Sequence, residues 1–388
     1  MGTASRILRF RWERGSAWTL ARGWLSFARH RLSASYAAVE ALLQRGAKEG
    51  VFSGAVLRVE GLRGTGALLE LAVGRVSSLP SGPAMQPSTL FDIASLTKLF
   101  SATLSLRLVA AEVLELDVDV SHVLAPQGQQ LRGVTLRNLL EHRSGLPAWR
   151  PYFESSVPVR EAALLEPLEA PPGSRHCYSD VGFLVLMELL ERASGRSFRE
   201  LMEQEVLVPL GLVEVGYRPV NGGESAALQR IAMGRFAATE QCPYRGLLCG
   251  EVHDDNTWAM GGVAAHAGLF ASAEQVAAFA RAWWQAPELS FLPAELRDQA
   301  WSGSAAGGHI LGWDTVSSGT SSAGQQLSRR SHGHLGFTGT SLWVDPERAI
   351  AVVLLSNRVH PERGNGAAIR RFRPQLHDAV AEFVDRMQ

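Results

Sequence analysis

Ser95 and Lys98 form the residue pair in this sequence that best suits covalent catalysis. They lie three residues apart in Ser95-Leu96-Thr97-Lys98, so at the start of a helix both side chains project from one face and their polar ends can meet. A serine hydroxyl becomes a nucleophile when a neighbour takes its proton, and a desolvated lysine with a lowered pKa can be that base. The pattern predicts attack by Ser95 and proton uptake by Lys98. By itself it also fits a capped, solvated helix start.

The use of lysine supports a chemical role for Lys98. Two of the 38 basic residues are lysine, Lys48 and Lys98, and the others are arginine. Arginine cannot give up its proton in a protein, whereas lysine can cycle through a neutral form. We interpret Lys48 as an ordinary surface residue.

Tyr178 is the candidate for a second proton-transfer group. Tyr178-Ser179-Asp180 follows a Pro-Pro-Gly turn and precedes a helix, which places the phenol at the edge of a loop. A phenol near a lysine ammonium can relay a proton to a leaving group. The alternative is a half-buried structural tyrosine whose hydroxyl is satisfied elsewhere.

The segment from His332 to Thr340 contains three glycines and precedes a predicted hairpin. Glycines at this density let a strand edge approach a ligand closely. Such an edge can offer a backbone N–H to a developing oxyanion and, with the N–H of Ser95, complete a hole with two donors. The alternative is a glycine-rich hairpin entry with solvated histidines.

Apolar periodicity predicts the elements that position these residues. Helices are expected at 36–48, 95–112, 136–141, 181–193, 273–284 and 367–387. Strands are expected at 51–60, 67–76, 90–94, 310–313, 341–344 and 350–356. Because strands stand at both ends of the chain, we expect an α/β (α+β) fold. One antiparallel sheet would be built from both termini and flanked by helices, with a mostly helical lobe inserted and the active site in the cleft between the lobes.

The three motifs occur in an order that resembles the serine β-lactamase and penicillin-binding-protein superfamily, and within it the class C β-lactamase-like serine hydrolases of the esterase-type branch. Further similar segments are Leu139–Pro147, Gly250–Asn256, Gly261–Val263 and His266–Phe270. The resemblance runs from about Ala34 to the C-terminus. We therefore expect a basic extension at 1–33 and a hydrolase domain at 34–388, with an α/β lobe at about 34–94 and 295–388 and a helical lobe at about 95–294.

The resemblance implies roles for individual residues. Ser95 would be the nucleophile, Lys98 its base and Tyr178 the proton shuttle to the leaving group. The backbone N–H groups of Ser95 and Phe337 would bind the oxyanion, and His334 and Gly336 would line the substrate channel. No metal or cofactor is implied, because the resemblance places the tempting set His253, Asp254 and Asp255 in a structural loop.

Two positions depart from the penicillin-recognising members. Asp180 stands where they usually have asparagine, which changes both the hydrogen bonding and the local charge. His334-Leu335-Gly336 replaces their Lys-Thr-Gly, and a mostly neutral imidazole serves an anionic substrate poorly. We therefore expect cleavage of a small-molecule ester or small amide. The alternatives are a D-Ala-D-Ala carboxypeptidase or β-lactamase, and a catalytically silent binding or sensor protein on the same fold.

The composition limits the possible binding partners and indicates the cellular compartment. The formal net charge is zero, so no basic field for nucleic acid is present and no such partner is expected. The three cysteines form neither an even set nor a C-x-x-C pair, which favours a reducing compartment.

Residues 1–33 carry seven arginines against one glutamate, with three tryptophans interleaved. We see neither the apolar core of a signal peptide nor a run of apolar residues long enough to span a membrane. A cytoplasmic protein is expected. The extension could contact a membrane surface as a basic amphipathic helix, pack on the enzyme as a helix, or be a mobile leader.

Overall fold

The computed structural model describes the backbone of residues 21–80, 82–218, 220, 223–285, 291–302, 308–317 and 321–387, and side chains from residue 32 onward. The predictions for residues 1–20, and for side chains before residue 32, lie outside these ranges. No helix within the described residues is both long enough and apolar enough to cross a membrane.

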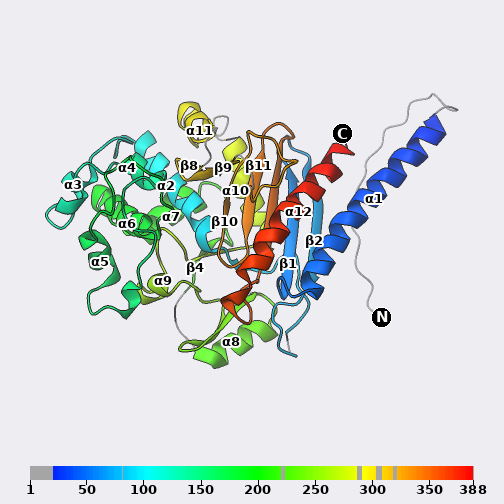
Figure 1. Cartoon of the computed structure of the whole chain (residues 1–388), viewed down its shortest axis with the longest axis horizontal. Coiled ribbons are helices and arrows are strands. Elements are labelled where there is room, and N and C mark those ends of the chain that lie inside the picture. The colour runs from blue at the N-terminus through cyan, green and yellow to red at the C-terminus, as the bar shows by residue number, and fades with distance from the viewer. Residues whose placement is uncertain are drawn as a thin grey trace.

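A seven-stranded antiparallel sheet forms the centre of the molecule, with its first two strands beside its last ones (Figure 1). In sheet order the strands are β2 (Gly66–Gly74), β1 (Gly54–Gly61), β12 (Ile350–Ser356), β11 (Ser341–Asp345), β10 (His332–Leu335), β9 (Trp313–Thr315) and β8 (Gly308–Ile310). The expected sheet from both termini is confirmed, and β1 pairs directly with β12.

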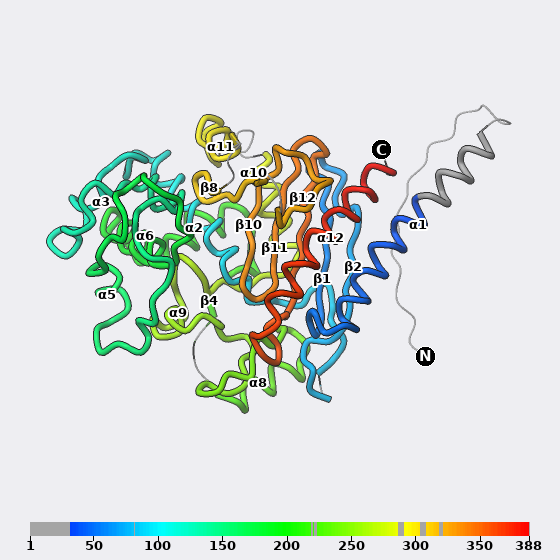
Figure 2. The backbone as a smooth tube through the Cα atoms, in the orientation of Figure 1, coloured from blue at the N-terminus to red at the C-terminus, as the bar shows by residue number. Residues whose placement is uncertain are grey.

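Alternation along β12 divides the core in two, because successive side chains of a strand point to opposite faces. Val352 and Leu354 pack with α1 (Ala21–Lys48) and α12 (Gly366–Asp385), which lie together on one face (Figure 2). Val353 and Leu355 join the larger core on the other face, which includes α10 (Ala273–Trp284) and extends into the helical lobe. The sheet is therefore covered by helices on both faces.

The helical lobe is built around α2 (Thr97–Ala110) and α6 (Asp180–Ser194), whose side chains are mostly buried. The other helices of the described chain are α3 (Val120–Val123), α4 (Leu136–Leu140), α5 (Val159–Leu165), α7 (Phe198–Met202), α8 (Gly223–Ala232), α9 (Asp255–Ala259) and α11 (Ala294–Ala300). The described chain also forms two small sheets. One contains β3 (Phe91–Asp92), β7 (Leu269–Ala271) and β4 (Gly216–Tyr217), and the other is the hairpin of β5 (Ala238–Cys242) and β6 (Gly246–Cys249).

Most expected elements are found within a few residues of their predicted bounds, and α10 and β12 match them at both ends. The strand expected at 310–313 is wrong. Leu311 and Gly312 have φ values of 43° and 91°, so this segment is the turn between β8 and β9. Leu311 and Trp313 are buried, so the turn has the apolar pattern of a strand.

Two expected domain boundaries do not match the elements. The division after residue 33 falls inside α1, whose backbone is helical from Ala21 to Lys48. Helix α10 was expected in the helical lobe but packs on β1 and β12, with an ion pair between Arg281 and Glu60. Its apolar stripe fits either setting, so sequence alone could not place it.

Gly333 has no room for a side chain, because a Cβ there would lie 2.3 Å from the Leu342 carbonyl oxygen and 2.5 Å from Trp343 Cδ2. We expect Gly333→Ala to lower the free energy of unfolding by about 1–3 kcal/mol, measured by urea denaturation. Gly364→Ala is the control, because a Cβ at Gly364 meets nothing within 4 Å. Equal stability of the two variants would contradict this account of β10.

Candidate active site

Ser95 lies in a tight 3₁₀ turn, Ala94–Leu96, that leads directly into α2. Ala94 has a φ of 47°, a conformation that non-glycine residues rarely adopt. The buried Asp92 carboxylate holds this turn, since one oxygen accepts from the Ala94 N–H at 2.8 Å and the other from the His253 N–H at 2.7 Å. The half-buried Ser95 side chain is therefore presented by a fixed, strained turn.

Lys98 meets Ser95 as the three-residue spacing predicted. Its Nζ donates to Ser95 Oγ at 3.0 Å, to Asp180 Oδ1 at 2.6 Å and to the His266 carbonyl at 3.3 Å. The Lys98 side chain is 0% exposed and that of Asp180 is 22% exposed. A fully buried amine thus contacts both the candidate nucleophile and a carboxylate.

The expectation of a lowered pKa for Lys98 is wrong. Burial pushes the pKa of Lys98 down, but the attraction of Asp180 and the hydrogen bonds to Asp180 and Tyr178 outweigh it, so the pKa is raised above 10.5. The lysine of the resting protein is an ammonium ion. The sequence indicates that Lys98 is buried, but not that the Asp180 carboxylate offsets the effect of burial on its pKa.

Tyr178 completes this group, with its ring centroid 4.8 Å from Lys98 Nζ. Burial raises the pKa of the phenol, and the charge of Lys98 and hydrogen bonds with Lys98 and Ser95 offset only part of this effect. Tyr178 is thus a neutral phenol at neutral pH. Ser95, Lys98, Tyr178 and Asp180 are brought together as predicted.

His142, His309 and His334 gather beside Tyr178, and one ring nitrogen of each lies within 4.8 Å of the other two. Burial, together with the repulsion of Lys98 and neighbouring imidazoles, holds the pKa of His142 and His309 well below the usual value. Burial also lowers the pKa of His334, to about 3. We call these three residues the histidine cluster; it is uncharged at neutral pH.

Backbone partners fix the tautomers of two of these rings. His142 Nδ1 accepts from the Ser179 N–H at 3.0 Å, so its Nε2 carries the proton. His334 Nδ1 donates to the Leu335 carbonyl at 2.8 Å, which leaves a lone pair on its Nε2. Neither Nε2 has a protein partner in the described part of the chain. The rings of His142 and His334 therefore present one N–H donor and one acceptor.

These tautomers do not suit a metal ion, although three imidazoles in one place invite that interpretation. A metal needs a lone pair from each ligand, and His142 could supply one from Nε2 only as an imidazolate. The absence of a metal stays a prediction from sequence, which this donor set supports.

The glycine-rich segment lies beside the turn that carries Ser95. Thr338 Oγ1 donates to the Asp92 carbonyl at 2.7 Å and Thr340 Oγ1 to the Ile93 carbonyl at 3.0 Å. A Cβ on Gly336 would lie 2.7 Å from the Ile93 oxygen, so this approach requires glycine. The side chain of Phe337 is 51% exposed, and its backbone is part of the segment pinned next to Ser95.

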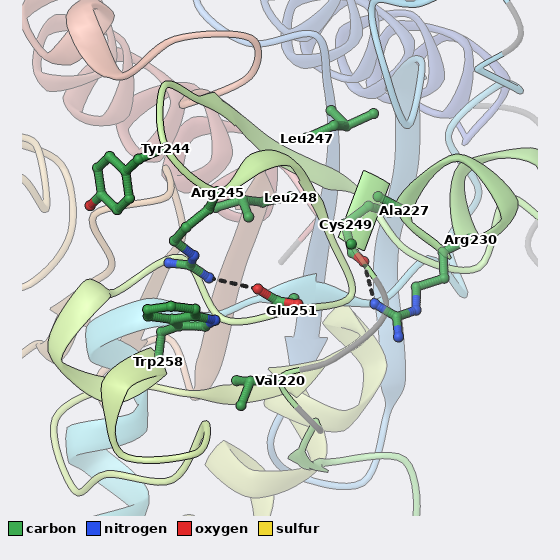
Figure 3. Close-up of a pocket in the computed structure, with 11 residues that line it drawn as sticks. Val220, Ala227, Arg230, Tyr244, Arg245, Leu247, Leu248, Cys249, Glu251 and Trp258 are labelled. Atoms are coloured by element: carbon green, nitrogen blue, oxygen red, sulfur yellow. Dashed lines mark hydrogen bonds and ion pairs between the residues drawn. The ribbon is translucent and has the colours of Figure 1, made fainter. Parts of the chain in front are cut away.

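The segment Gly250–Asn256 wraps around Arg245 outside this group. Arg245 donates to the carbonyls of Val252 and His253 and pairs with Glu251 and Asp255. Figure 3 shows this arginine bonded to Glu251 and lying over Trp258. These residues line a hollow of about 220 Å³ that no residue of the Ser95 group lines. His253 bonds Glu240, and Asp254 caps α9. The segment is thus structural, as the resemblance implied.

Sequence reasoning missed three contributors to the site, Asp92, His309 and His142. Asp92 lies in a short apolar approach with no signal of its role, and only the folded turn shows its two backbone contacts. His309 belongs to no recognisable motif and reaches the cluster only because β8 pairs with β9. His142 lies inside the segment Leu139–Pro147, so that motif could have identified it.

Known proteins are similar to this chain over most of its length. A family model described as Beta-lactamase matches residues 39–374. An N-acetylmuramyl-L-alanine amidase of Bacillus subtilis (strain 168) is 30% identical over 315 residues, covering 73% of this chain and 71% of the relative. A putative D-alanyl-D-alanine carboxypeptidase of Escherichia coli (strain K12) is 28% identical over 309 residues, covering 70% of each protein.

Solved structures share the fold. EstCE1, described as a hydrolase with promiscuous acyltransferase activity, has a TM-score of 0.69 at 20% identity over 90% of this chain and 100% of its own. A β-lactamase (Mb2281c) of Mycobacterium bovis has a TM-score of 0.58 at 23% identity over 88% of this chain and 98% of its own.

The charge of Lys98 can be tested directly, because ¹³C-labelled lysine gives two Cε signals in a chain with two lysines. We expect NMR titration to place the pKa of Lys98 above 10.5 in the wild type. Asp180→Asn should bring the pKa below that value, because burial remains while the largest attraction is lost.

Lys48→Arg assigns the two signals, and the Lys48 signal serves as the internal reference. A wild-type Lys98 that titrates below 10.5, or an Asp180→Asn variant with an unchanged titration, would overturn the assignment of an ammonium ion held by Asp180.

Proposed function

Because the chain belongs to the beta-lactamase family, we propose that it is a serine hydrolase that cleaves a carboxylic ester or small amide through an acyl-enzyme on Ser95. One observation carries the proposal: Lys98 Nζ lies 3.0 Å from Ser95 Oγ and 2.6 Å from Asp180, with Tyr178 beside them. A nucleophile, a proton acceptor and a proton donor are within reach of one another.

The acylation step follows from the charges in the resting site. Ser95 Oγ bonds to the substrate carbonyl carbon and loses its proton to Lys98, while Lys98 passes one of its protons to the Asp180 carboxylate. The carbonyl electrons move to the oxygen, which accepts hydrogen bonds from the N–H groups of Ser95 and Phe337.

Collapse of this intermediate restores the carbonyl and breaks the bond to the leaving group. The leaving atom takes the proton of the Tyr178 phenol, and Lys98 returns a proton to Tyr178 as Asp180 gives one back to Lys98. The serine proton has then reached the leaving group with no net change in the protein. Water reverses these steps and releases the acid.

The histidine cluster supports an uncharged substrate. A substrate carboxylate beside the reacting carbonyl needs a cation or several donors, whereas the cluster is uncharged, with an N–H on His142 and a lone pair on His334. Lys98 is the nearest charge, and Asp180 already neutralises it. An ester or small amide without an anionic group fits this environment better than a β-lactam.

The relatives favour a second candidate, a peptidase or amidase acting on cell-wall peptides. This observation is independent of the site, because it rests on the names of proteins that are 27–30% identical to the chain. The Asp180 and His334 positions argue against it, since both remove features that recognise an anionic peptide end. A peptide ending in D-Ala-D-Ala tests this candidate against esters.

We expect a fluorophosphonate probe to label the wild type at one site and Ser95→Ala not at all, because the probe reacts with an activated serine. Mass spectrometry of the labelled peptide identifies the residue. A folded wild type that stays unlabelled would instead favour the catalytically silent binding or sensor protein.

We expect kcat/KM for p-nitrophenyl butyrate to exceed that for nitrocefin and for a D-Ala-D-Ala peptide, because those two substrates carry a carboxylate. Faster turnover of nitrocefin would favour a β-lactamase, and faster release of D-alanine a carboxypeptidase.

Lys98→Arg should reduce kcat/KM for the ester by about 100-fold or more, because guanidinium keeps a positive charge but cannot accept the serine proton. Lys48→Arg is the matched control, since it makes the same exchange at an exposed position of α1. A Lys98→Arg variant with near wild-type turnover would exclude Lys98 from proton transfer.

A further inference from the structure

Arg373 of α12 contacts the segment 336–340, which contains the backbone N–H proposed to bind the oxyanion. Its guanidinium Nη2 donates to the carbonyls of Gly336 and Thr340, each at 2.7 Å. The residue is 5% exposed, and no carboxylate pairs with it in the part of the chain that the structure describes. The hydrogen bonds that the structure shows for this buried cation thus go to two backbone oxygens.

An uncompensated buried charge is costly, and an apolar side chain would fill the same space without that cost. Burial lowers the pKa of Arg373, and the charge of Arg358 lowers it further. The two carbonyls are the groups that gain from the guanidinium, because a charged donor makes stronger hydrogen bonds than a neutral one. We therefore expect the charge of Arg373 to act on the segment 336–340.

The Gly336 carbonyl has two donors, since the Gly339 N–H also reaches it at 3.1 Å. The peptide bond between Gly336 and Phe337 is trans, so its N–H points opposite to this carbonyl. Arg358 Nε holds the next carbonyl, that of Phe337, at 2.8 Å. Fixing these oxygens fixes the direction of the Phe337 N–H, which points away from Arg373.

The same segment is pinned to the residues that precede Ser95 through Thr338 and Thr340. Arg373 therefore acts on a peptide unit that is held next to the candidate nucleophile. A positive charge bonded to the carbonyl end also draws electrons along the peptide and strengthens the N–H as a donor, because linked hydrogen bonds polarise one another.

We propose that Arg373 is a positioning residue for the oxyanion hole: its guanidinium orients and polarises the Gly336–Phe337 peptide so that the Phe337 N–H meets the oxygen of the reacting carbonyl. This inference rests on the proposed function. It adds an electrostatic role for a helix that touches neither Ser95 nor Lys98 in the described structure.

Arg373→Gln tests the proposal by removing the charge and keeping a donor. We expect the single-turnover acylation rate with an ester to fall about tenfold or more, which is less than the 10²–10³-fold loss on removing an oxyanion donor outright. Arg373→Lys, which keeps the charge, should recover part of that loss.

A thionoester substrate separates positioning from a general structural effect. Its developing anion is on sulfur, which accepts hydrogen bonds poorly, so it depends less on the oxyanion hole. The ratio of oxo-ester to thionoester acylation rates should therefore fall in Arg373→Gln. Rates are compared per folded protein, with the folded fraction taken from thermal unfolding followed by circular dichroism.

Arg192→Gln is the matched control. Arg192 Nη1 also donates to two backbone carbonyls, those of Leu124 at 2.9 Å and Ala125 at 3.3 Å, but it lies on α6 away from the segment 336–340. Its rate ratio should equal that of the wild type.

An Arg373→Gln variant with an unchanged ratio, whether the two rates stay at wild-type values or fall equally, overturns the role of Arg373. If the wild type itself is not labelled at Ser95 by the fluorophosphonate, the proposed function fails and this inference with it. The two failures are therefore distinct.

Discussion

The ion pair between Lys98 and Asp180 sets the electrostatics of the whole site. A lysine with no exposed side-chain surface keeps its charge mainly because a carboxylate lies 2.6 Å away. That charge in turn repels protons from His142, His309 and His334 and helps to keep them neutral. The first turn of α6, where backbone N–H groups favour negative charge, holds Asp180 in place. The surrounding imidazoles and the Tyr178 phenol are uncharged mainly because they are buried, and the charge of Lys98 adds to this effect for the imidazoles.

Much of this arrangement could be predicted from the sequence, for reasons that are local. Ser95 and Lys98 meet because a three-residue spacing at a helix start brings side chains together, whatever the rest of the chain does. The aliphatic and β-branched runs at both ends of the chain, with helical patterns between them, predict strands that meet in one sheet. Other features depend on contacts between distant segments. The ionisation of Lys98 depends on Asp180, a residue 82 positions away. His309 joins the cluster because β8 pairs with β9, whereas the sequence pattern predicts one strand at 310–313.

The family resemblance leaves the substrate open, since one fold carries several chemistries. The relatives include proteins named as an amidase and a carboxypeptidase, and the solved structures a hydrolase with acyltransferase activity. Two positions, Asp180 and His334, bear on these possibilities. Asp180 adds a negative charge beside the lysine, and His334 contributes an imidazole whose Nδ1 is committed to the backbone. Both positions therefore bear on the charge that a substrate would meet near Ser95.

The order of strands in the large sheet has a consequence for how the chain is made. β1 lies between β2 and β12, so in the hairpin formed by residues 54–74 the β1 edge stays unpaired until residues 350–356 leave the ribosome. At a synthesis rate of about 5–20 residues per second, that interval is on the order of 15 to 60 seconds. An exposed strand edge is a template for pairing with another chain. The nascent protein therefore passes through a period of vulnerability to aggregation that ends only when its last strand arrives.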